Sequence, residues 1–258
     1  MELQGKVSLV TGAGSGIGRA AALKLADGGS DVVVISRSQD EIDAVAAEIR
    51  ERGRHALAIT ADIADAVAME SAVARTLDEL GSLSIVFANA GINGVWAPLH
   101  ELSPDDWDET SRINLRGTFL TLRYTVPAML ETGGSIIITS SINGTRTFTT
   151  PGASAYATTK AGQLALGQMA ALELARYRIR VNVICPGAID TEIDDNTEKQ
   201  GVEPPVPVEF PQGTVPLTRG EPGTSEEVAD LVVFLASDRS RHITGTPIWI
   251  DGGQSLLV

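Results

Sequence analysis

Tyr156 and Lys160 stand four residues apart in the segment YATTK, a spacing that places two side chains side by side on one face of a helix. A phenol and an amine both have reference pKa values near ~10, so they make a poor surface ion pair. A nearby ammonium group does, however, favour the ionised phenol and lower its pKa. Bringing a tyrosine from ~10 to ~7 takes about 4 kcal/mol of differential stabilisation. Such a tyrosine can act as a general acid near neutral pH, although the pair alone fits a surface aromatic beside a solvated lysine equally well.

A glycine-rich segment, TGAGSGIG (11–18), follows the first apolar run of the chain. Glycines let the backbone approach a pyrophosphate closely, and a helix beginning near Gly16 supplies amide donors and positive potential. No register gives GxGxxG, because Ile17 or Arg19 stands where the third glycine is needed, and no GxxxxGKS/T loop is present. A glycine-rich turn alone is weak evidence. After a buried strand near the N-terminus it favours dinucleotide binding over a plain turn.

The end of the second apolar run bears on the choice of dinucleotide. An acidic residue at that position would hold the adenosine ribose hydroxyls of NAD. The chain has Ser36 and Arg37 there instead, and Asp31 lies at the other end of the run. Loss of the carboxylate removes repulsion toward a 2′-phosphate, and arginine adds a planar charged donor for it. We therefore expect NADP(H), with NAD(H) as the alternative if Arg37 is a solvated loop residue.

Seven short apolar runs supply the elements that must position these residues. Most are continuous rather than alternating, as expected for parallel strands buried on both faces. Helix-length segments separate them, for example 40–53 and 66–81, each closing on a glycine. We expect a single α/β domain over 1–258, a Rossmann-type doubly wound parallel sheet of about seven strands with helices on both faces. The runs are KVSLV, DVVVIS, HALAIT, LSIVFA, SIIIT, RVNVIC and TPIWID.

Glycines and small polar residues follow directly after most of these runs. In open α/β sheets the ligand crevice lies outside the carboxyl ends of the strands, so such positions converge on one edge. Any one of them could be an ordinary turn, but six together predict a ligand site. The positions are Gly12 to Gly18, Ser36–Arg37, Asp62, Asn89–Ala90–Gly91, Ser140–Ser141 and Pro186–Gly187.

The segments TGAGSGIG, ANAG, INL, TSS, YATTK, PGAIDT and TGTPIWIDGG together resemble the short-chain dehydrogenase/reductase family. The resemblance covers nearly the whole chain, and the motifs stand in the family's order. Ser15 occupies the middle glycine of the TGxxGxxG loop of the extended branch, so the chain resembles the shorter branch, with TGxxxGxG and YxxxK. The resemblance implies hydride transfer between a nicotinamide cofactor and a secondary alcohol or ketone.

The resemblance also implies a role for each matching residue. Tyr156 would be the general acid/base, and Lys160 its electrostatic partner, which also holds the nicotinamide ribose. Ser141 would position the substrate oxygen. Asn114 would support a water that links Lys160 to solvent, unless it is merely a cap or an interior hydrogen bonder. Besides Tyr156 and Lys160, the implied cofactor contacts are Gly12, Ser15, Gly16, Ile17, Ser36, Arg37, Asp62, Ile63, Asn89, Ala90, Gly91, Ile189 and Thr191.

The chain departs from the family pattern in two places. The connection from Ser141 to Tyr156 is slightly longer than usual, which leaves the choice between Ser140 and Ser141 open. Ala88 stands where many members carry a second asparagine, a change that keeps the backbone turn but removes one side-chain hydrogen bonder.

Composition and the remaining motifs exclude several classes of function. The net charge of −13 argues against a nucleic-acid partner. We see no signal peptide, no apolar run of membrane-spanning length and only one cysteine, Cys185, so we expect a cytoplasmic protein. No GxSxG elbow or metal-ligand cluster is present, and His55, His100 and His242 have no evident partners. The main rival from another class is a nucleotide-sensing binding protein without turnover.

Two further features concern the substrate and partners. The acidic, proline-rich segment at about 191–219 lacks clear periodicity and is expected to be a substrate lid. The helix that carries Tyr156 has almost no charge before Glu173, whereas a surface helix should have a polar face. We therefore expect a homo-oligomer, a tetramer or a dimer. Candidate substrate-pocket residues are Trp96, Arg146, Phe148 and Phe210.

Overall fold

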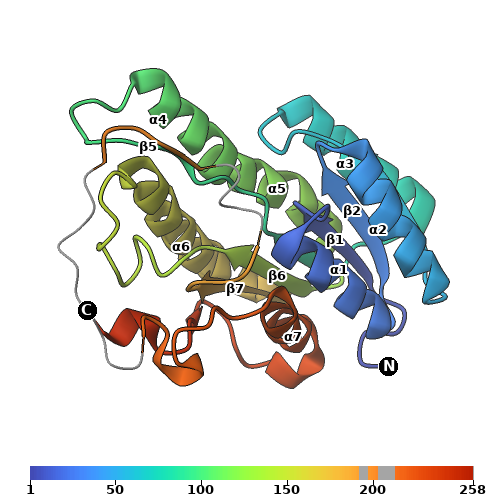
Figure 1. Cartoon of the computed structure of the whole chain (residues 1–258). Helices are drawn as coiled ribbons and strands as arrows, with labels where there is room; N and C mark the ends of the chain where they lie inside the picture. Colours follow the sequence, from blue (N-terminus) through green and yellow to red (C-terminus); the bar gives the residue numbers. More distant parts are fainter. Residues whose placement is uncertain (192–196, 203–212, 258) are drawn as a thin grey trace.

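Seven parallel strands form the central sheet, in the order β3-β2-β1-β4-β6-β7-β9 (Figure 1). The computed structural model describes residues 1–191, 197–202 and 213–257. The strand order reverses between β1 and β4, and ligands bind at such a switch point. Each predicted apolar run overlaps one strand, which confirms the predicted fold class. The strands are β1 (Val7–Thr11), β2 (Asp31–Ser36), β3 (Ala56–Thr60), β4 (Ile85–Ala88), β6 (Gly134–Thr139), β7 (Ile179–Pro186) and β9 (Pro247–Ile250).

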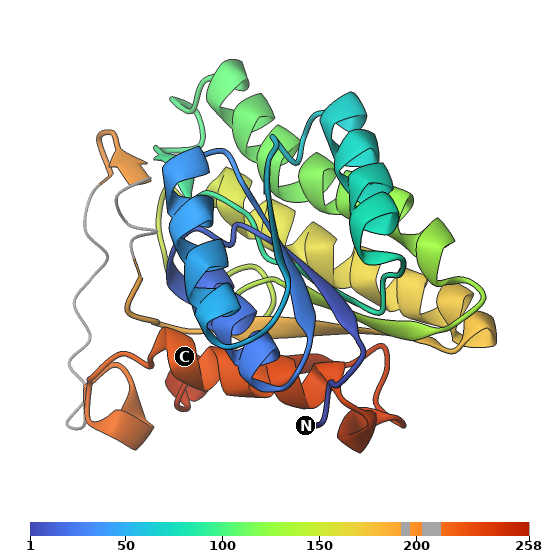
Figure 2. The same ribbon diagram turned by 90° about the vertical axis from the view of Figure 1, so that its right-hand side faces the viewer.

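Helices cover both faces of the sheet, as the turned view shows (Figure 2). One apolar core lies between the sheet and α1, α2 and α7, and a second lies between the sheet and α3, α5 and α6. The helices are α1 (Gly16–Asp27), α2 (Gln39–Glu51), α3 (Ala66–Leu80), α4 (Pro104–Ser111), α5 (Gly117–Thr125), α6 (Ser154–Leu174) and α7 (Ser225–Ala236). Short 3₁₀ turns occur at Val126–Met129, Ala175–Tyr177, Pro216–Thr218, Asp238–Ser240 and Gln254–Leu256.

Local sequence signals explain where the helices begin and end. Asp65 caps α3 by accepting hydrogen bonds from the amides of Val67 and Ala68. The same helix ends on Gly81, whose φ of 75° is left-handed, as predicted for a glycine cap. The predicted helix over 40–53 ends slightly earlier, and Gly53 follows it with a φ of 73°.

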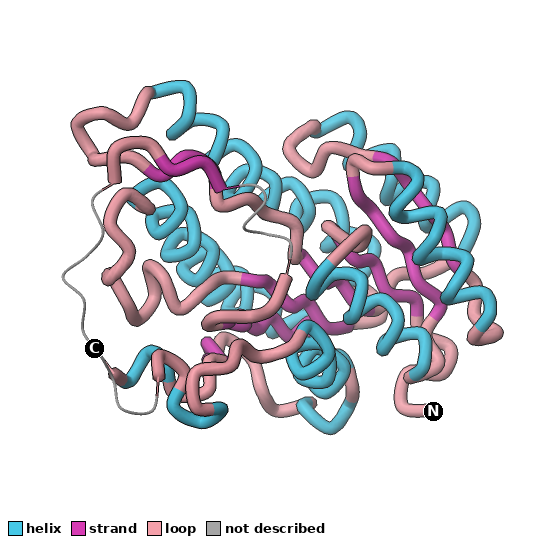
Figure 3. Tube along the Cα trace, in the orientation of Figure 1, coloured by secondary structure: helices cyan, strands magenta, loops and turns pink. Residues whose placement is uncertain are grey.

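A second, two-stranded sheet lies apart from the central one, at the upper left of Figure 3. It pairs β5 (Gly94–Trp96) in parallel with β8 (Thr197–Lys199), and the Asn93 side-chain amide donates to Thr197 Oγ1 at 2.7 Å. This pairing attaches part of the predicted lid to the segment that follows β4. Residues 192–196 and 203–212 of that lid lie outside the described residues, as does Phe210. No helix within the described ranges has the length and apolar character needed to cross a membrane.

Candidate functional site

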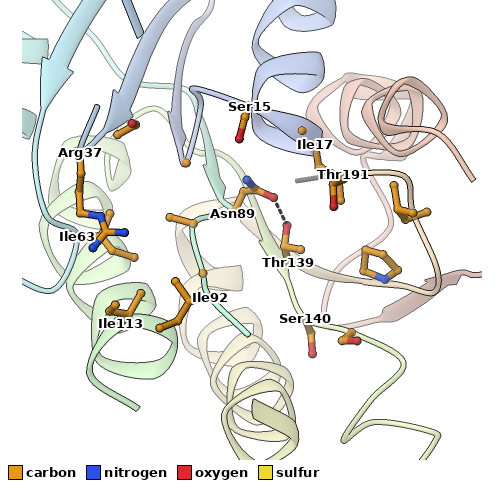
Figure 4. Close-up of a pocket in the computed structure, with 18 of the residues that line it drawn as sticks. Ser15, Ile17, Arg37, Ile63, Asn89, Ile92, Ile113, Thr139, Ser140 and Thr191 are labelled. Carbon is orange, nitrogen blue, oxygen red and sulfur yellow. Dashed lines mark hydrogen bonds between the residues drawn. The ribbon is translucent and has the colours of Figure 1, made fainter. Parts of the chain in front are cut away.

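A cavity of about 500 Å³ opens at the carboxyl ends of the strands, beside the switch point between β1 and β4 (Figure 4). Every residue predicted to contact the cofactor lines it, and so does Ser141. The structure therefore brings together six separate stretches of sequence, as predicted. The other residues that line the cavity were not among the predicted cofactor contacts; they are Ser38, Glu41, Ala61, Ile92, Ile113, Thr139, Ser140, Pro186 and Gly187.

The glycine loop gives this cavity one wall shaped for a phosphate group. Gly12 has a φ of 64°, which favours glycine, and a Cβ at Gly18 would collide with the Gly12 carbonyl oxygen. α1 begins at Gly16, and its N-cap Ser15 makes no side-chain capping hydrogen bond. The Ser15 side chain therefore accepts no hydrogen bond from the first-turn amides of α1, which lie beside the cavity. A helix N-terminus of this kind attracts anions. This wall fits the pyrophosphate of a dinucleotide.

Asp62, one of the predicted cofactor contacts, lines the cavity and accepts hydrogen bonds from two different segments. One carboxylate oxygen accepts a hydrogen bond from the Ala64 amide at 2.9 Å, and the other accepts one from Arg112 at 2.8 Å. Partial burial raises the pKa of Asp62, but the hydrogen bonds outweigh this and the net pKa lies below its ordinary value. Arg112 also pairs with Glu109, at 2.7 Å. No sequence motif pointed to Arg112.

The turn after β4 is tied to both neighbouring strands. The amides of Asn89 and Ala90 donate to Thr11 Oγ1 at 3.0 and 3.2 Å. The Thr139 hydroxyl donates to Asn89 Oδ1 at 3.0 Å, a bond drawn in Figure 4. The turn is therefore hydrogen-bonded to both neighbouring strands, although position 88 carries an alanine instead of a second asparagine.

Tyr156 and Lys160 lie one turn apart on α6, both buried. Lys160 Nζ is 5.4 Å from the centroid of the Tyr156 ring and donates to the Thr139 carbonyl oxygen at 3.1 Å. The Lys160 residue is 3% exposed, and this burial lowers its pKa to about 8. Because a pKa of 8 keeps most lysine side chains protonated at pH 7, the site holds a cation close to the phenol.

The two serines after β6 make different hydrogen bonds. Ser140 Oγ donates to the Lys160 carbonyl oxygen at 2.7 Å, so its proton is engaged within the protein. Ser141 Oγ accepts from the Asn143 amide at 3.1 Å, a hydrogen bond that does not engage the Ser141 proton. Both residues line the cavity. The two hydroxyls thus differ, since a described carbonyl oxygen accepts the Ser140 proton and the Asn143 amide donates to Ser141.

Asn114 lies behind the cavity wall rather than in it. It belongs to a π-helical turn, Arg112–Arg116, between α4 and α5. Its side chain is fully buried, exchanges hydrogen bonds with the backbone of Ile92 at 2.8 and 2.9 Å, and donates to Thr159 Oγ1 at 3.1 Å. A Cβ at Gly91 would lie 3.0 Å from Asn114 Oδ1 and 3.5 Å from Lys160 Nζ. Asn114 is thus close to Lys160, and its role in a water link stays a prediction.

The candidate substrate-pocket residues in the described ranges do not line this cavity. Trp96 lies in β5, Phe148 is 78% exposed, and Arg146 stacks over the Trp249 ring at 3.9 Å. Cys185 is fully buried on β7, as a small strand residue should be. Within the described part of the chain, no group of three or more His, Cys, Asp or Glu side chains is placed to hold a metal ion.

Comparison with known proteins identifies the family. The model of a family described as enoyl-(acyl carrier protein) reductase matches residues 12–255. The crystal structure of a 3-ketoacyl-ACP reductase from Sinorhizobium meliloti superposes with a TM-score of 0.94 and 56% identity, covering 98% of this chain and 100% of that one. The chain belongs to the short-chain dehydrogenase/reductase family.

Other solved members of the family carry nicotinamide cofactors. A short-chain dehydrogenase from Burkholderia cenocepacia in complex with NADP is 36% identical, with a TM-score of 0.86 and coverage of 98% and 99% of the two chains. Carveol dehydrogenase from Mycobacterium avium in complex with NAD is 29% identical, with a TM-score of 0.89 and 99% coverage of both chains. This short-chain dehydrogenase/reductase is an NAD(P)-dependent oxidoreductase that acts on CH–OH groups.

Proposed function

We propose that this enzyme transfers a hydride between NADP(H) and a secondary alcohol or the corresponding ketone, with Tyr156 as general acid/base. One observation carries the proposal: Ser141, Tyr156 and Lys160 share a single cavity with a glycine loop that fits a pyrophosphate. A protein that only senses the nucleotide needs the loop but has no use for the proton-handling side chains. We therefore favour the enzyme over a silent binding protein.

In this proposal the bound nicotinamide accepts or supplies the hydride, and the protein handles the proton. For reduction, Ser141 donates a hydrogen bond to the carbonyl oxygen and polarises it. Tyr156 then gives its phenolic proton to the oxygen as negative charge develops there. The Lys160 ammonium stabilises the phenolate that remains, so one hydride and one proton have been added to the ketone. Asn114 supports the proton path behind Lys160.

Arg37 supports NADP(H) as the favoured cofactor, with NAD(H) also possible. Its side chain extends into the cavity near Ile63 (Figure 4) and makes no salt bridge or hydrogen bond with another described residue. A guanidinium with no committed partner is suited to pair with a 2′-phosphate. The adenosine end is further bounded by Ser36 and Asp62.

We also propose that the chain is one catalytic domain, with a lid at about 191–219, and that it forms a homo-oligomer in the cytoplasm. Along α6, Met169 and Leu172 are exposed. An apolar groove borders this helix, and its lining includes Leu115, Phe119 and Leu166. A second copy of the chain would cover this face, since exposed apolar patches of this kind mark interaction sites.

A panel of ketones and secondary alcohols, followed by nicotinamide absorbance with each cofactor, tests the proposed reaction. On any substrate that turns over, Tyr156→Phe should lower kcat about 10³-fold, the range of a general acid, while nucleotide binding is retained. A Tyr124→Phe variant on α5 is the matched control and should keep full activity. Full activity of Tyr156→Phe would refute the mechanism, and nucleotide binding without turnover on any substrate would favour the silent binding protein.

A further inference from the structure

Glu41 presents a carboxylate to the cavity that the sequence pattern did not assign. It lies in the first turn of α2 and lines the cavity beside Ser38. Its side chain folds back onto the glycine loop: a Cβ at Gly14 would collide with Glu41 Oε2 and lie 3.0 Å from Glu41 Cβ. The carboxylate thus bridges the space between the glycine loop and the residues after β2.

This space is where the adenosine ribose of a dinucleotide lies in a Rossmann-type fold. In that arrangement the pyrophosphate sits on the glycine loop, and an acidic residue at the end of the second strand binds the ribose hydroxyls. Here β2 ends on Ser36, which has no charge. Glu41 brings a carboxylate to the same space from the following helix.

The charged side chains near the adenosine end of the cavity differ in whether they form salt bridges or hydrogen bonds within the protein. Asp62 is held by Arg112 and by the Ala64 amide. Neither Arg37 nor Glu41 makes a salt bridge or hydrogen bond with another described residue. Arg37 points toward Ile63 in Figure 4, whereas Glu41 lies against the glycine loop. The adenosine of a bound dinucleotide would therefore lie near one cation, Arg37, and one anion, Glu41, that pair with no other described residue.

We propose that Glu41 is a specificity-determining residue for the cofactor, one that opposes Arg37. Its carboxylate accepts a hydrogen bond from a ribose hydroxyl of NAD(H) and repels the 2′-phosphate of NADP(H). The preference for NADP(H) that Arg37 confers is thereby reduced, and the enzyme uses both dinucleotides. This inference rests on the proposed function only in requiring that a nicotinamide dinucleotide binds in this cavity.

The size of the effect follows from electrostatics. Two like unit charges about 4 Å apart in water weaken an association by about fivefold, and a phosphate carries up to two such charges. Replacing the carboxylate by an amide also exchanges a charge-assisted hydrogen bond for a neutral one, which weakens binding by about fivefold. Glu41→Gln should therefore tighten NADPH binding and weaken NADH binding, and so shift the ratio of their Kd values by at least about tenfold.

The test is a fluorescence titration of NADPH and NADH into the full-length wild type, Glu41→Gln and Glu51→Gln. Glu51 is an exposed glutamate at the other end of α2, about 15 Å along the helix from Glu41, so its variant controls for net charge. We expect the ratio of Kd values to shift only in Glu41→Gln. The gain in NADPH affinity should shrink as salt is raised, because mobile ions screen the repulsion.

Titrations of adenosine 2′,5′-bisphosphate and AMP with the same proteins locate the effect at the 2′ position. The bisphosphate should gain affinity in Glu41→Gln, whereas AMP should not. An unchanged NADPH-to-NADH ratio in Glu41→Gln, with binding intact, overturns this inference and leaves the proposed function standing. A wild type that bound neither dinucleotide would overturn both.

Discussion

Lys160 Nζ lies 5.4 Å from the centroid of the Tyr156 ring, one helical turn away, in a position where the lysine is 3% exposed. An ammonium group placed there would stabilise a phenolate electrostatically, but its own charge loses contact with water. The pKa of Lys160 falls to about 8 for that reason. In the proposed mechanism, the chain gives up folding stability at Lys160 for a Tyr156 that can donate a proton near neutral pH, as functional sites often do.

Replacing Lys160 by methionine should raise stability and abolish activity. Burial lowers the pKa of this lysine from 10.5 in the unfolded chain to about 8 in the fold. At about 1.36 kcal/mol per unit, the buried charge costs about 3 kcal/mol at pH 7. Methionine removes that cost but leaves the Thr139 carbonyl without its partner, which costs about 1 kcal/mol. Urea denaturation at pH 7 should show Lys160→Met more stable by about 2 kcal/mol.

The pH dependence of the same comparison gives an independent check. Between pH 8 and 10.5 the unfolded chain binds more protons at this lysine than the folded chain does, so the free energy of unfolding of the wild type rises with pH in that window. The advantage of Lys160→Met should therefore shrink as the pH approaches 10. Lys6→Met, at an exposed site, should match the wild type throughout. A Lys160→Met protein less stable than the wild type at pH 7 would contradict the electrostatic account.

Alanine variants of the two serines should separate their roles. Ser141→Ala removes the available hydroxyl donor, so kcat/KM should fall about 10²-fold to 10³-fold, as for loss of one donor to a developing oxyanion. Ser140→Ala removes the hydrogen bond to the Lys160 carbonyl, so it should lose about 1 kcal/mol of unfolding free energy and keep most of its activity. Steady-state kinetics and urea denaturation of both variants show which serine contacts the substrate and which one stabilises the fold. The opposite pattern would assign the substrate contact to Ser140.

The sheet and the cavity could be predicted because their signals are local and repeated. A short, β-branched apolar run bounded by turn residues favours a buried strand, and parallel strands bring the residues after them to one edge. The glycine loop is recognisable from its residue types alone. The Tyr156–Lys160 spacing is equally direct, because a four-residue interval on a helix places two side chains on one face. These features depend little on distant parts of the chain.

The features that were missed depend on contacts between distant segments. β5 and β8 are three residues each and pair across about a hundred positions, too short for any periodic pattern. Arg112 reaches Asp62 from a π-helical turn that no propensity indicates. Glu41 reaches the glycine loop from the first turn of α2, and no motif at the end of β2 indicates this contact. The direction of a side chain decides the cases of Arg112 and Glu41.

A lysine at position 165 should dissociate the proposed oligomer. Ala165 lies on the exposed side of α6, two turns after Thr158 and one before Met169, so the substitution is tolerated in a monomer at a cost within about 0.5 kcal/mol. If a second copy covers this face, the buried charge prevents association. Sedimentation should then show a multiple of 27.1 kDa for the wild type and a 27.1 kDa monomer for Ala165→Lys. Ala47→Lys, on the exposed side of α2, is the matched control and should sediment as the wild type does. A monomeric wild type would show that α6 exposes its apolar face for some other reason.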